Sequence, residues 1–297
     1  MGPLSVVIVN WNAGAALEEC LTSLFASDPW GGEMEVFLVD NGSTDGSQAV
    51  AAKAFPTITL VQNADNRGFA SAINQGLHLA RGELALILNP DVALLPTAIP
   101  RLVAFMVEHA QAAVVGPKLL NPDGSVQGSA RRDPSPWTGL FGRSALLTRL
   151  FPGNPISRRE LPGLASHGDE PLGVDWVSGA CFLVRRKAYE EIGLMDERFF
   201  LFWEDADWCL RFRRAGWRVY YLRTAVARHR VGVSRARRPI RSVLDFHRSA
   251  YYFYRKHHLA SAAHPMMAVL VAGLLASLGA RVLQALLAGA MKPRGEG

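Results

Sequence analysis

The chain has few cysteines, and it lacks the short sequence patterns of several common enzyme classes. Its three cysteines are isolated, and without a C-x-x-C pair neither a disulfide framework nor a thiolate metal site is indicated. No G-x-G-x-x-G follows the first predicted strand, and G-x-x-x-x-G-K-[ST], H-E-x-x-H and G-x-S-x-G do not occur. These absences argue against dinucleotide redox enzymes, P-loop enzymes, zinc proteases and serine hydrolases.

The N-terminus also lacks the basic region and long apolar core of a secretory signal. The opening "MGPLSVVIVNWN" is instead typical of a buried first strand. Together with the unpaired cysteines, this favours a reducing, cytosolic compartment. Hydrophobic residues make up 49% of the chain and charged residues 20%, proportions that are ordinary for a globular protein.

The charge balance is basic, with a net charge of +6 and an isoelectric point of about 9.5. Such a balance suits an anionic partner, whether nucleotide phosphate, acidic lipid or nucleic acid. No nucleic-acid-binding motif is present, so we expect no nucleic acid partner. Arginine is concentrated in residues 213–218 and 228–241, which could bind phosphate oxygens or could simply form a solvated basic face.

Apolar runs of strand length alternate with segments of helical periodicity, which predicts an α/β fold with a doubly wound, mostly parallel sheet. The expected strands are 4–10, 35–40, 57–63 and 83–89, and the expected helices are 15–27, 47–55 and 69–81. A strand and a helix are expected within 173–193, a helix at 204–216 and a strand at 217–222. Residues 131–172 are rich in proline, glycine and arginine and predict a long surface loop that acts as a lid or substrate loop.

Each of the first four expected strands ends in polar residues. In open α/β sheets, ligands bind outside the carboxyl ends of the strands, so these segments should converge on one crevice. Asparagine, aspartate and glycine are also good turn formers, but four such ends in succession favour a site. The four segments are Asn10 to Asn12, Asp40 to Ser43, Asn63 to Gly68 and Asn89 to Asp91.

Two aspartates in these segments have side chains that suit a nucleotide ligand. Asp40, at the end of the second strand, is placed to accept a hydrogen bond from the imide N–H of a pyrimidine base. Asp91 follows the fourth strand, and its carboxylate could coordinate a divalent cation together with substrate phosphates. Such a cation would offset the charge of a departing diphosphate.

The C-terminal part, 241–297, is predicted to be helical and to lie on a membrane. Residues 242–258 form an amphipathic pattern, and 265–291 are nearly all apolar. Arg281 would cost roughly 2.5 to 3.5 kcal/mol at the centre of a bilayer, so insertion within one leaflet fits better than a span. The alternative is that this helix packs against a second subunit, as in a homodimer.

Several segments in order resemble the family 2 glycosyltransferases of the GT-A fold, most of all the bacterial branch that includes rhamnosyltransferases. The resemblance covers roughly residues 4–230. It rests on "SVVIVNWN", "VDNGSTDGS", "NRGFASAINQG", "LNPDV", a histidine in "RH" and the long segment from "VSGACF" to "FFLFWEDADWCLRFRRAGWRVYY".

The resemblance implies a dTDP or UDP sugar as donor, transfer with inversion, and Mg²⁺ or Mn²⁺ as cofactor. In this interpretation, Asp91 and His229 bind the metal. Asn89 replaces the first acidic residue of the family's D-x-D motif, and this departure leaves the affinity for the metal open. A surface histidine in a basic loop is the alternative for His229. The implied nucleotide- and donor-binding residues are Asn10, Asn12, Asp40, Asn41, Gly42, Asn66, Arg67, Gly68, Asn89 and Asp91.

The resemblance also explains why carboxylates lie among aromatic residues in "FFLFWEDADW". An inverting transfer needs a base for the acceptor hydroxyl, and apolar surroundings raise a carboxyl pKa towards a useful value. We expect Asp205 to be this base and Glu204 its orienting partner, with Asp207 pointing away as a charge at a helix N-terminus. Alternatively, all three acids are structural. Trp176, Gly179 and Trp203 are expected to bind the acceptor, although core packing would equally explain the tryptophans.

The sequence thus predicts a GT-A domain over 1–240, with a nucleotide-binding half at 1–116, an acceptor and catalytic half at 117–240, and a C-terminal extension. The expected function is transfer of rhamnose from dTDP-rhamnose to a glycan or polyprenyl-linked acceptor at the cytoplasmic face of the cell membrane, in cell-envelope polysaccharide synthesis. Because Asn89 departs from the family pattern, the alternative is a catalytically silent nucleotide-sugar-binding scaffold.

Overall fold

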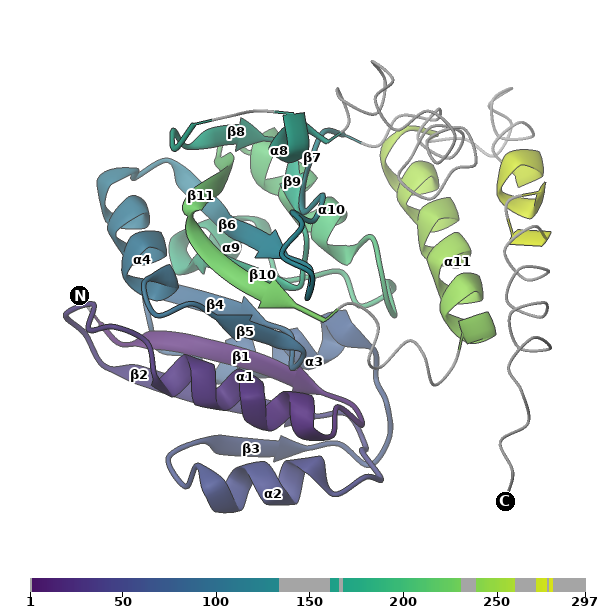
Figure 1. Ribbon diagram of the computed structural model, residues 1–297. Coiled ribbons are helices and arrows are strands. Elements are labelled where there is room, and N and C mark those ends of the chain that lie inside the picture. Colours follow the sequence, from purple (N-terminus) through teal and green to yellow (C-terminus); the bar gives the residue numbers. More distant parts are fainter. Residues whose placement is uncertain are drawn as a thin grey trace.

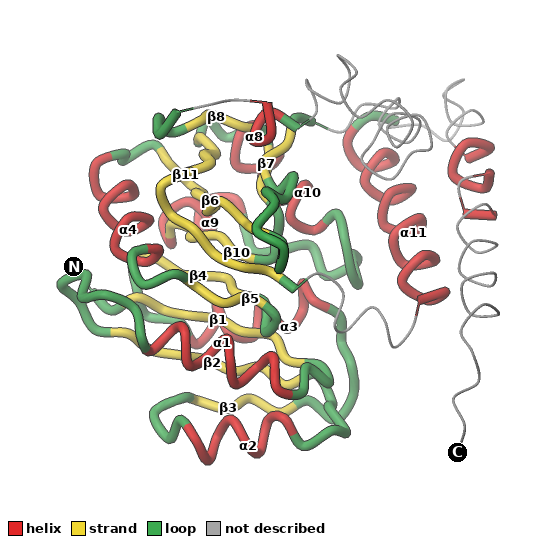
Figure 2. The backbone as a smooth tube through the Cα atoms, viewed as in Figure 1, coloured by secondary structure: helices red, strands yellow, loops and turns green. Residues whose placement is uncertain are grey.

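The protein is built around one large β-sheet with helices on both faces (Figures 1 and 2). The computed structural model describes residues 2–133, 161–165, 168–230, 239–259, 271–276 and 278–279. The strands of the large sheet are β1 (Leu4–Asn10), β2 (Met34–Asp40), β3 (Thr59–Gln62), β4 (Leu84–Leu88), β5 (Val92–Leu94), β6 (Ala112–Leu120), β8 (Leu172–Val174), β10 (Cys181–Arg185) and β11 (Arg218–His229). A small second sheet pairs β7 (Ala130–Arg131) with β9 (Trp176–Val177).

The strands of the large sheet follow the order β3-β2-β1-β4-β10-β6-β11-β5, with β8 paired to β11. The pairs β1–β2, β1–β4, β2–β3 and β6–β11 are parallel, and β10 lies antiparallel between β4 and β6. Strands β1, β2, β3, β4, β6 and β11 therefore all run the same way. The mostly parallel sheet predicted from the alternating apolar runs is confirmed.

Helices cover both faces of this sheet, and a hydrophobic core lies on each face. The central strands β1 and β4 are buried along their whole length, as expected for apolar strands that are covered on both sides. Leu17 and Leu102 belong to one core, and Ile73 and Trp208 to the other. The helices are α1 (Ala15–Phe25), α2 (Ser47–Ala54), α3 (Phe69–Leu79), α4 (Ala98–Glu108), α8 (Pro162–Ala165), α9 (Arg186–Ile192), α10 (Glu204–Arg214) and α11 (Pro239–His257).

The expected elements of the first third are present with ends shifted by at most a few residues. The largest difference concerns β11, which was expected to end at residue 222 but continues to His229. Its second half pairs with β5 in the register His229↔Val92, and β5 itself was not predicted. This pairing matters for the site because it holds His229 next to the segment that carries Asp91.

The halves proposed for the domain share the large sheet, and β6 runs across position 116 as one continuous strand. The division of the chain at 116 and at 240 stays a prediction. The expected loop at 131–172 and the apolar segment at 265–291 fall largely outside the described residues. Among the residues that the structure describes, no helix combines the length and apolarity that a membrane crossing requires.

Candidate active site

The carboxyl ends of the strands, the start of α10 and the first turns of α11 enclose a cavity of about 250 Å³. It lies where open α/β sheets bind ligands, beyond the ends of the parallel strands. Nine of the residues singled out in the sequence line it: Asn41, Asn66, Gly68, Asn89, Asp91, Gly179, Glu204, Asp205 and His229. The structure thus brings Asp91 and Asp205 to one common cavity.

The ends of β1 and β2 form a buried polar layer next to this cavity. Asn10 lies beside Asp40 in the parallel register, and its Nδ2 donates to Asp40 Oδ1 at 2.8 Å. The other carboxylate oxygen of Asp40 accepts the N–H of Ser43 at 3.0 Å. These bonds hold the Asp40 carboxylate rigidly, because each oxygen is already oriented by a donor. Neither Asn10 nor Asp40 lines the cavity wall itself.

The loop that follows β3 forms one side of the cavity. Asn41 donates from Nδ2 to the carbonyl of Gly68 at 3.0 Å, and Asn66 Oδ1 accepts the Gly68 N–H at 2.9 Å. Gly68 has φ +89°, and a Cβ there would lie 2.6 Å from the carbonyl oxygen of Phe200. Only glycine allows the Asn66 loop to approach the segment before α10 this closely.

Three more of the predicted donor-binding residues also lie away from the cavity wall. Asn12 accepts the N–H of Thr44 on its side-chain oxygen at 2.8 Å and so shapes the loop after β2. Arg67 is exposed and lies 3.9 Å from Asp65. Gly42 has φ +72° and lies close to the backbone of Asp65. Their roles in donor binding stay predictions.

The two tryptophans expected to bind the acceptor are likewise outside the cavity wall. Trp176 donates from Nε1 to the carbonyl of Arg132 at 2.9 Å. Trp203 packs against α11, with 5.1 Å between its ring centroid and that of Phe253. Both therefore occupy the packed positions that were the alternative interpretation, and a role in acceptor binding stays a prediction.

Two buried oxygens of the N-P-D segment have no hydrogen-bond partner within the described part of the chain. They are Asn89 Oδ1 and Asp91 Oδ1. A buried oxygen without a donor is costly, and native structures usually pair such groups. Asp91 Oδ1 lies 3.4 Å from His229 Nε2, and the two residues meet because β11 pairs with β5.

The orientation of His229 is set by Gln127, a residue that the sequence did not single out. Gln127 Nε2 donates to the His229 carbonyl at 2.8 Å and to Asn121 Oδ1 at 2.9 Å, so its Oε1 must face His229 Nδ1, at 2.9 Å. Nδ1 therefore carries the proton in the neutral imidazole. Nε2 is then left with a lone pair directed at Asp91. Gln127 lies in an irregular stretch, and no local pattern marks it.

This arrangement fits a divalent cation. No group of three or more His, Cys, Asp or Glu suited to a metal is found among the described residues, so acidic and imidazole ligands alone do not make a full site. However, Asp91, His229 and Asn89 all line one cavity, and Asp91 Oδ1 and Asn89 Oδ1 receive no hydrogen bond within the described part of the chain. Metal-bound histidines typically donate their other N–H to an oxygen, as His229 does to Gln127.

The segment before α10 is held in an uncommon conformation. Phe202 and Trp203 both have positive φ, at 69° and 70°. Such left-handed residues cost about 1 to 3 kcal/mol each unless they are glycine, and they tend to cluster at functional sites. The turn ends at Trp203, and α10 then starts with Glu204 and Asp205 facing the cavity. The backbone is therefore strained where the two carboxylates are presented.

The two carboxyl groups have different surroundings. Burial raises the pKa of Asp205, although its oxygens accept the N–H groups of Gly179 and Ala206, each at 2.8 Å. Burial and the charge of Asp205 raise the pKa of Glu204 well above its usual range, and Glu204 Oε2 has no partner among the described residues. The two backbone N–H groups favour the ionised form of Asp205, whereas the Glu204 oxygen without a donor favours the neutral form of Glu204. This separation suits a base and a neutral neighbour.

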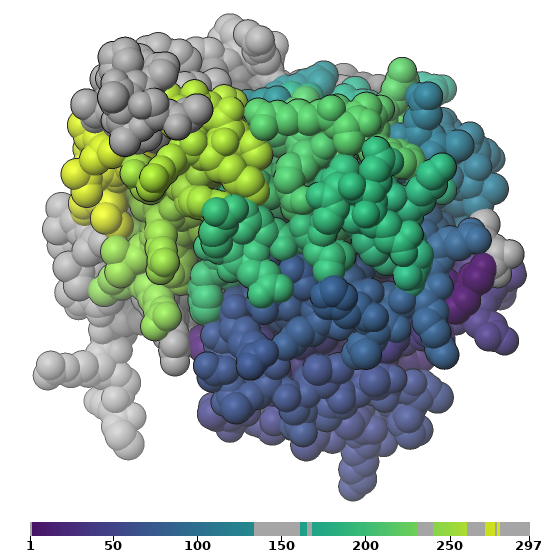
Figure 3. Space-filling model, turned by 180° about the vertical axis from the view of Figure 1, so that it is seen from behind, coloured from purple at the N-terminus to yellow at the C-terminus, as the bar shows by residue number. Residues whose placement is uncertain are grey.

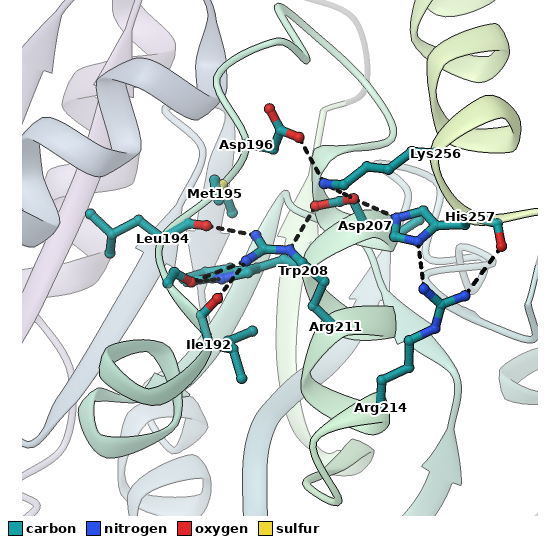
Figure 4. A network of polar contacts seen from close by, with 12 residues as sticks. Ile192, Leu194, Met195, Asp196, Asp207, Trp208, Arg211, Arg214, Lys256 and His257 are labelled. Atoms are coloured by element: carbon teal, nitrogen blue, oxygen red, sulfur yellow. Dashed lines mark hydrogen bonds and ion pairs between the residues drawn. The ribbon is translucent and has the colours of Figure 1, made fainter. Parts of the chain in front are cut away.

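Asp207 points away from the cavity, as expected, but it is fully buried in a polar cluster (Figure 4). The Asp207 network comprises Asp207, Arg211, Lys256 and His257. Asp207 accepts from Arg211 at 2.9 Å and from both Lys256 and His257 at 2.6 Å. Burial would raise the pKa of Asp207, but the bonds from His257 and Lys256 and the charge of Arg211 outweigh it and lower that pKa. The network ties α10 to α11.

Two arginines of the segment 213–218, Arg213 and Arg214, are engaged in such structural contacts. Arg213 bonds Asp175 at 2.9 Å and Asp133 at 2.5 Å, and Arg214 donates to His257 Nδ1 at 3.0 Å. Residues 231–238, which carry three of the six arginines of the segment 228–241, lie outside the described residues. The cavity receives Arg241, the last arginine of the segment 228–241, together with Ser242 and Asp245 of α11, which were not predicted to be site residues.

The chain was compared with known protein families and proteins. It matches the family model "Glycosyl transferase family 2" over residues 5–193. It is 34% identical, over 86% of this chain and 85% of the relative, to an N-acetylglucosaminyl-diphospho-decaprenol L-rhamnosyltransferase of Mycobacterium tuberculosis.

Two solved structures share the fold at 19% sequence identity. One is a mannosyltransferase of Pyrobaculum calidifontis in complex with GDP-Man and Mn²⁺, with a TM-score of 0.59 over 98% of this chain and 80% of that one. The other is GalNAc-T7 with UDP, GalNAc and Mn²⁺, with a TM-score of 0.58 over 77% of this chain and 44% of that one. Both are similar to this chain in the α/β architecture around the large sheet.

Proposed function

The chain belongs to glycosyl transferase family 2, and on this premise we propose that it transfers a sugar, with inversion, from a nucleotide diphosphate sugar to a hydroxyl of a lipid-linked acceptor. The observation that carries the proposal is one cavity lined at the strand ends by Asp91 and His229 and at the start of α10 by Asp205. A leaving diphosphate and an incoming hydroxyl need such opposed groups.

The donor would lie over the carboxyl ends of the strands. Asp91, His229 and the oxygen of Asn89 would hold Mg²⁺ or Mn²⁺ there. When bound, the cation supplies charge neutralisation for the diphosphate leaving group. Asn89 fits this role because an amide oxygen can replace a carboxylate oxygen as a ligand of a hard cation.

Asp205 would act on the acceptor as general base. It accepts the proton of the acceptor hydroxyl while that oxygen bonds to the anomeric carbon, and the bond to the nucleoside diphosphate breaks on the opposite face. The N–H of Gly179 holds Asp205 Oδ2 in place. Neutral Glu204 avoids a second negative charge beside this carboxylate.

We propose rhamnose from dTDP-rhamnose as the sugar and an N-acetylglucosaminyl diphosphate lipid as the acceptor, in cell-envelope polysaccharide synthesis. The support is the name of the mycobacterial relative, which is similar over most of both chains. An acceptor of this kind would be met at the cytoplasmic face of the membrane. The exposed Leu244 and Arg248 on α11 and the apolar sequence at 265–291 support contact with that surface, which flotation with anionic lipid vesicles would test.

The central test is the variant Asp205→Asn. Its rate of transfer should fall by about 10² to 10⁴-fold, the typical contribution of a positioned general base. The affinity for the donor should stay unchanged, because the donor lies at the strand ends whereas Asp205 lies at the start of α10, where the acceptor hydroxyl is expected. Transfer is measured with dTDP-rhamnose and an N-acetylglucosaminyl diphosphate with a short lipid tail, and donor affinity by calorimetry.

Glu108→Gln is the matched control, since Glu108 is an exposed carboxylate on α4. It should have wild-type activity. Normal turnover of Asp205→Asn would remove Asp205 from the role of base. Donor binding by the wild type without any transfer or hydrolysis would instead indicate the silent scaffold.

A further inference from the structure

Helix α11 lies outside the residues that match the family model, which end at 193, yet it forms part of the cavity. Arg241, Ser242 and Asp245 on its first two turns line the cavity that also contains Glu204 and Asp205. Figures 1 and 3 show α11 beside the main body of the protein, next to the segments before and within α10. The cavity is therefore completed by an element that the family match does not include.

The position of α11 is fixed by several buried contacts. Ser249 donates to the carbonyl of Leu201 at 2.9 Å, directly behind the strained turn. Tyr252 and Lys256 both donate to Asp196, at 3.0 and 2.7 Å. The Asp207 network adds the bonds shown in Figure 4. Phe253 of α11 is fully buried and packs against α10. A helix held in this way presents a preformed wall.

The chemistry of this wall suits a sugar. Within the described part of the chain, the carboxylate of Asp245 has no hydrogen bond or ion pair of its own. Burial raises the pKa of Asp245, although the positive charges of Arg241 and Arg248 act to lower it, so the carboxylate is partly desolvated. The Arg241 guanidinium lies 5.8 Å from the ring centroid of Phe200, which also lines the cavity. Carboxylates and guanidinium groups bond sugar hydroxyls, while aromatic rings cover apolar sugar faces.

We propose that Arg241, Ser242 and Asp245 form a subsite for the sugar of the acceptor, with their side chains bonding its hydroxyl groups. The donor end of the cavity is made by the strand ends at Asn41, Asn66 and Asp91, and α11 supplies another part of the wall. An acceptor bound against α11 brings its hydroxyl to the catalytic carboxylate. This subsite rests on the proposed function, since it assigns the second substrate of that same reaction.

The test uses the full chain and the variants Asp245→Asn and Arg241→Gln. Initial rates are measured at saturating dTDP-rhamnose with varied concentrations of the short-tailed N-acetylglucosaminyl diphosphate lipid. Loss of a hydrogen bond from a charged group should raise the acceptor KM about 10 to 100-fold. The donor dissociation constant and the slow hydrolysis of the donor without acceptor should stay within about twofold of wild type, because neither needs α11.

Arg255→Gln is the matched control, because Arg255 is exposed on the same helix but does not line the cavity. Its acceptor KM should equal that of the wild type. The subsite alone is refuted if both variants transfer with an unchanged acceptor KM, or if donor affinity falls as much as acceptor affinity. If the wild type neither transfers nor hydrolyses the donor, the proposed function fails and the subsite fails with it.

Discussion

At the scale of single residues, neighbouring carboxyl groups in this protein have different properties because of what donates to them. Asp205 receives two backbone N–H groups, while Glu204 is buried and has an oxygen without a donor in the described structure. Burial raises the pKa of both, and the charge of Asp205 raises that of Glu204 further. One side chain is thus prepared to be a base and the other to stay neutral.

The variant Glu204→Gln tests this division of roles. Because burial raises the pKa of Asp205, kcat/KM should fall as pH falls through a value above the ordinary aspartate range. Glutamine replaces a carboxyl that is already neutral at that pH, so the acid limb should not move. The rate should fall by less than about 10-fold, short of the loss expected for a missing base. A pH profile of transfer provides the measurement, and disappearance of the acid limb would make Glu204 the base.

Gln127 offers a second prediction at this scale, because it fixes the proton of His229 on Nδ1. In Gln127→Met, the ring loses its acceptor, and the affinity for Mn²⁺ should fall about 10 to 100-fold, the usual effect of losing such a partner. Titration calorimetry measures the affinity, and nitrogen-15 spectra of the histidines report the tautomer. Gln111→Met, at an exposed glutamine, is the control. An unchanged Mn²⁺ affinity in Gln127→Met would contradict the metal assignment of His229.

At the scale of elements, α10 connects catalysis to the C-terminal helix. Its first turn carries Glu204 and Asp205 on the cavity side and Asp207 on the side that faces away from the cavity. Asp207 in turn holds Lys256 and His257, near the end of α11. The other end of α11 carries Asp245 into the cavity. The same short segment therefore presents the base and anchors the opposite wall.

The variant Asp207→Asn should loosen α11. Removing one partner from a buried ion pair typically costs about 3 to 5 kcal/mol, and Asp207 is fully buried. Because the pKa of Asp207 is lowered in the fold, its contribution is present above the unfolded value of about 3.9 and lost as pH falls through the folded value. The deficit should thus be complete at pH 7 and shrink only in stronger acid.

Denaturant unfolding measures this deficit, and hydrogen exchange of residues 239–257 should accelerate in Asp207→Asn. Glu190→Gln is a matched control, since Glu190 also pairs with an arginine four residues away, Arg186, but is 58% exposed. Its effect should stay below about 1 kcal/mol. If both variants lowered the free energy of unfolding equally, burial of the Asp207 network would add no stability beyond that of an exposed ion pair.

At the scale of the whole molecule, the sheet brings the parts of the site together. The ends of β1, β2 and β4 meet because these strands are parallel neighbours, and β11 adds His229 by pairing with β5. The antiparallel strand β10 lies between β4 and β6, and Gly179 lies just before it. Its N–H therefore bonds Asp205 in the wall of the cavity. No helix or loop alone contains this site.

Much of this frame was predictable from the sequence. Apolar runs such as "LSVVIVN" predict strands that are buried on both faces, and the polar residues after them predicted a crevice at the strand ends. Short pairings were not predictable, because β5, β7, β8 and β9 have two or three residues each and carry no periodicity. The segment 242–258 was correctly predicted as a helix, but its place at the cavity was not.

The sequence by itself determined the alternation of strands and helices, the polar strand ends and the carboxylates at the start of α10, because each depends on residues close along the chain. Only the tertiary structure decided which oxygens lack donors, which nitrogen of His229 faces Asp91, and which wall α11 completes. These properties depend on desolvation and on partners such as Gln127 and His229, which are 102 residues apart. Local patterns contain no information about such distant contacts, so the fold had to bring them together first.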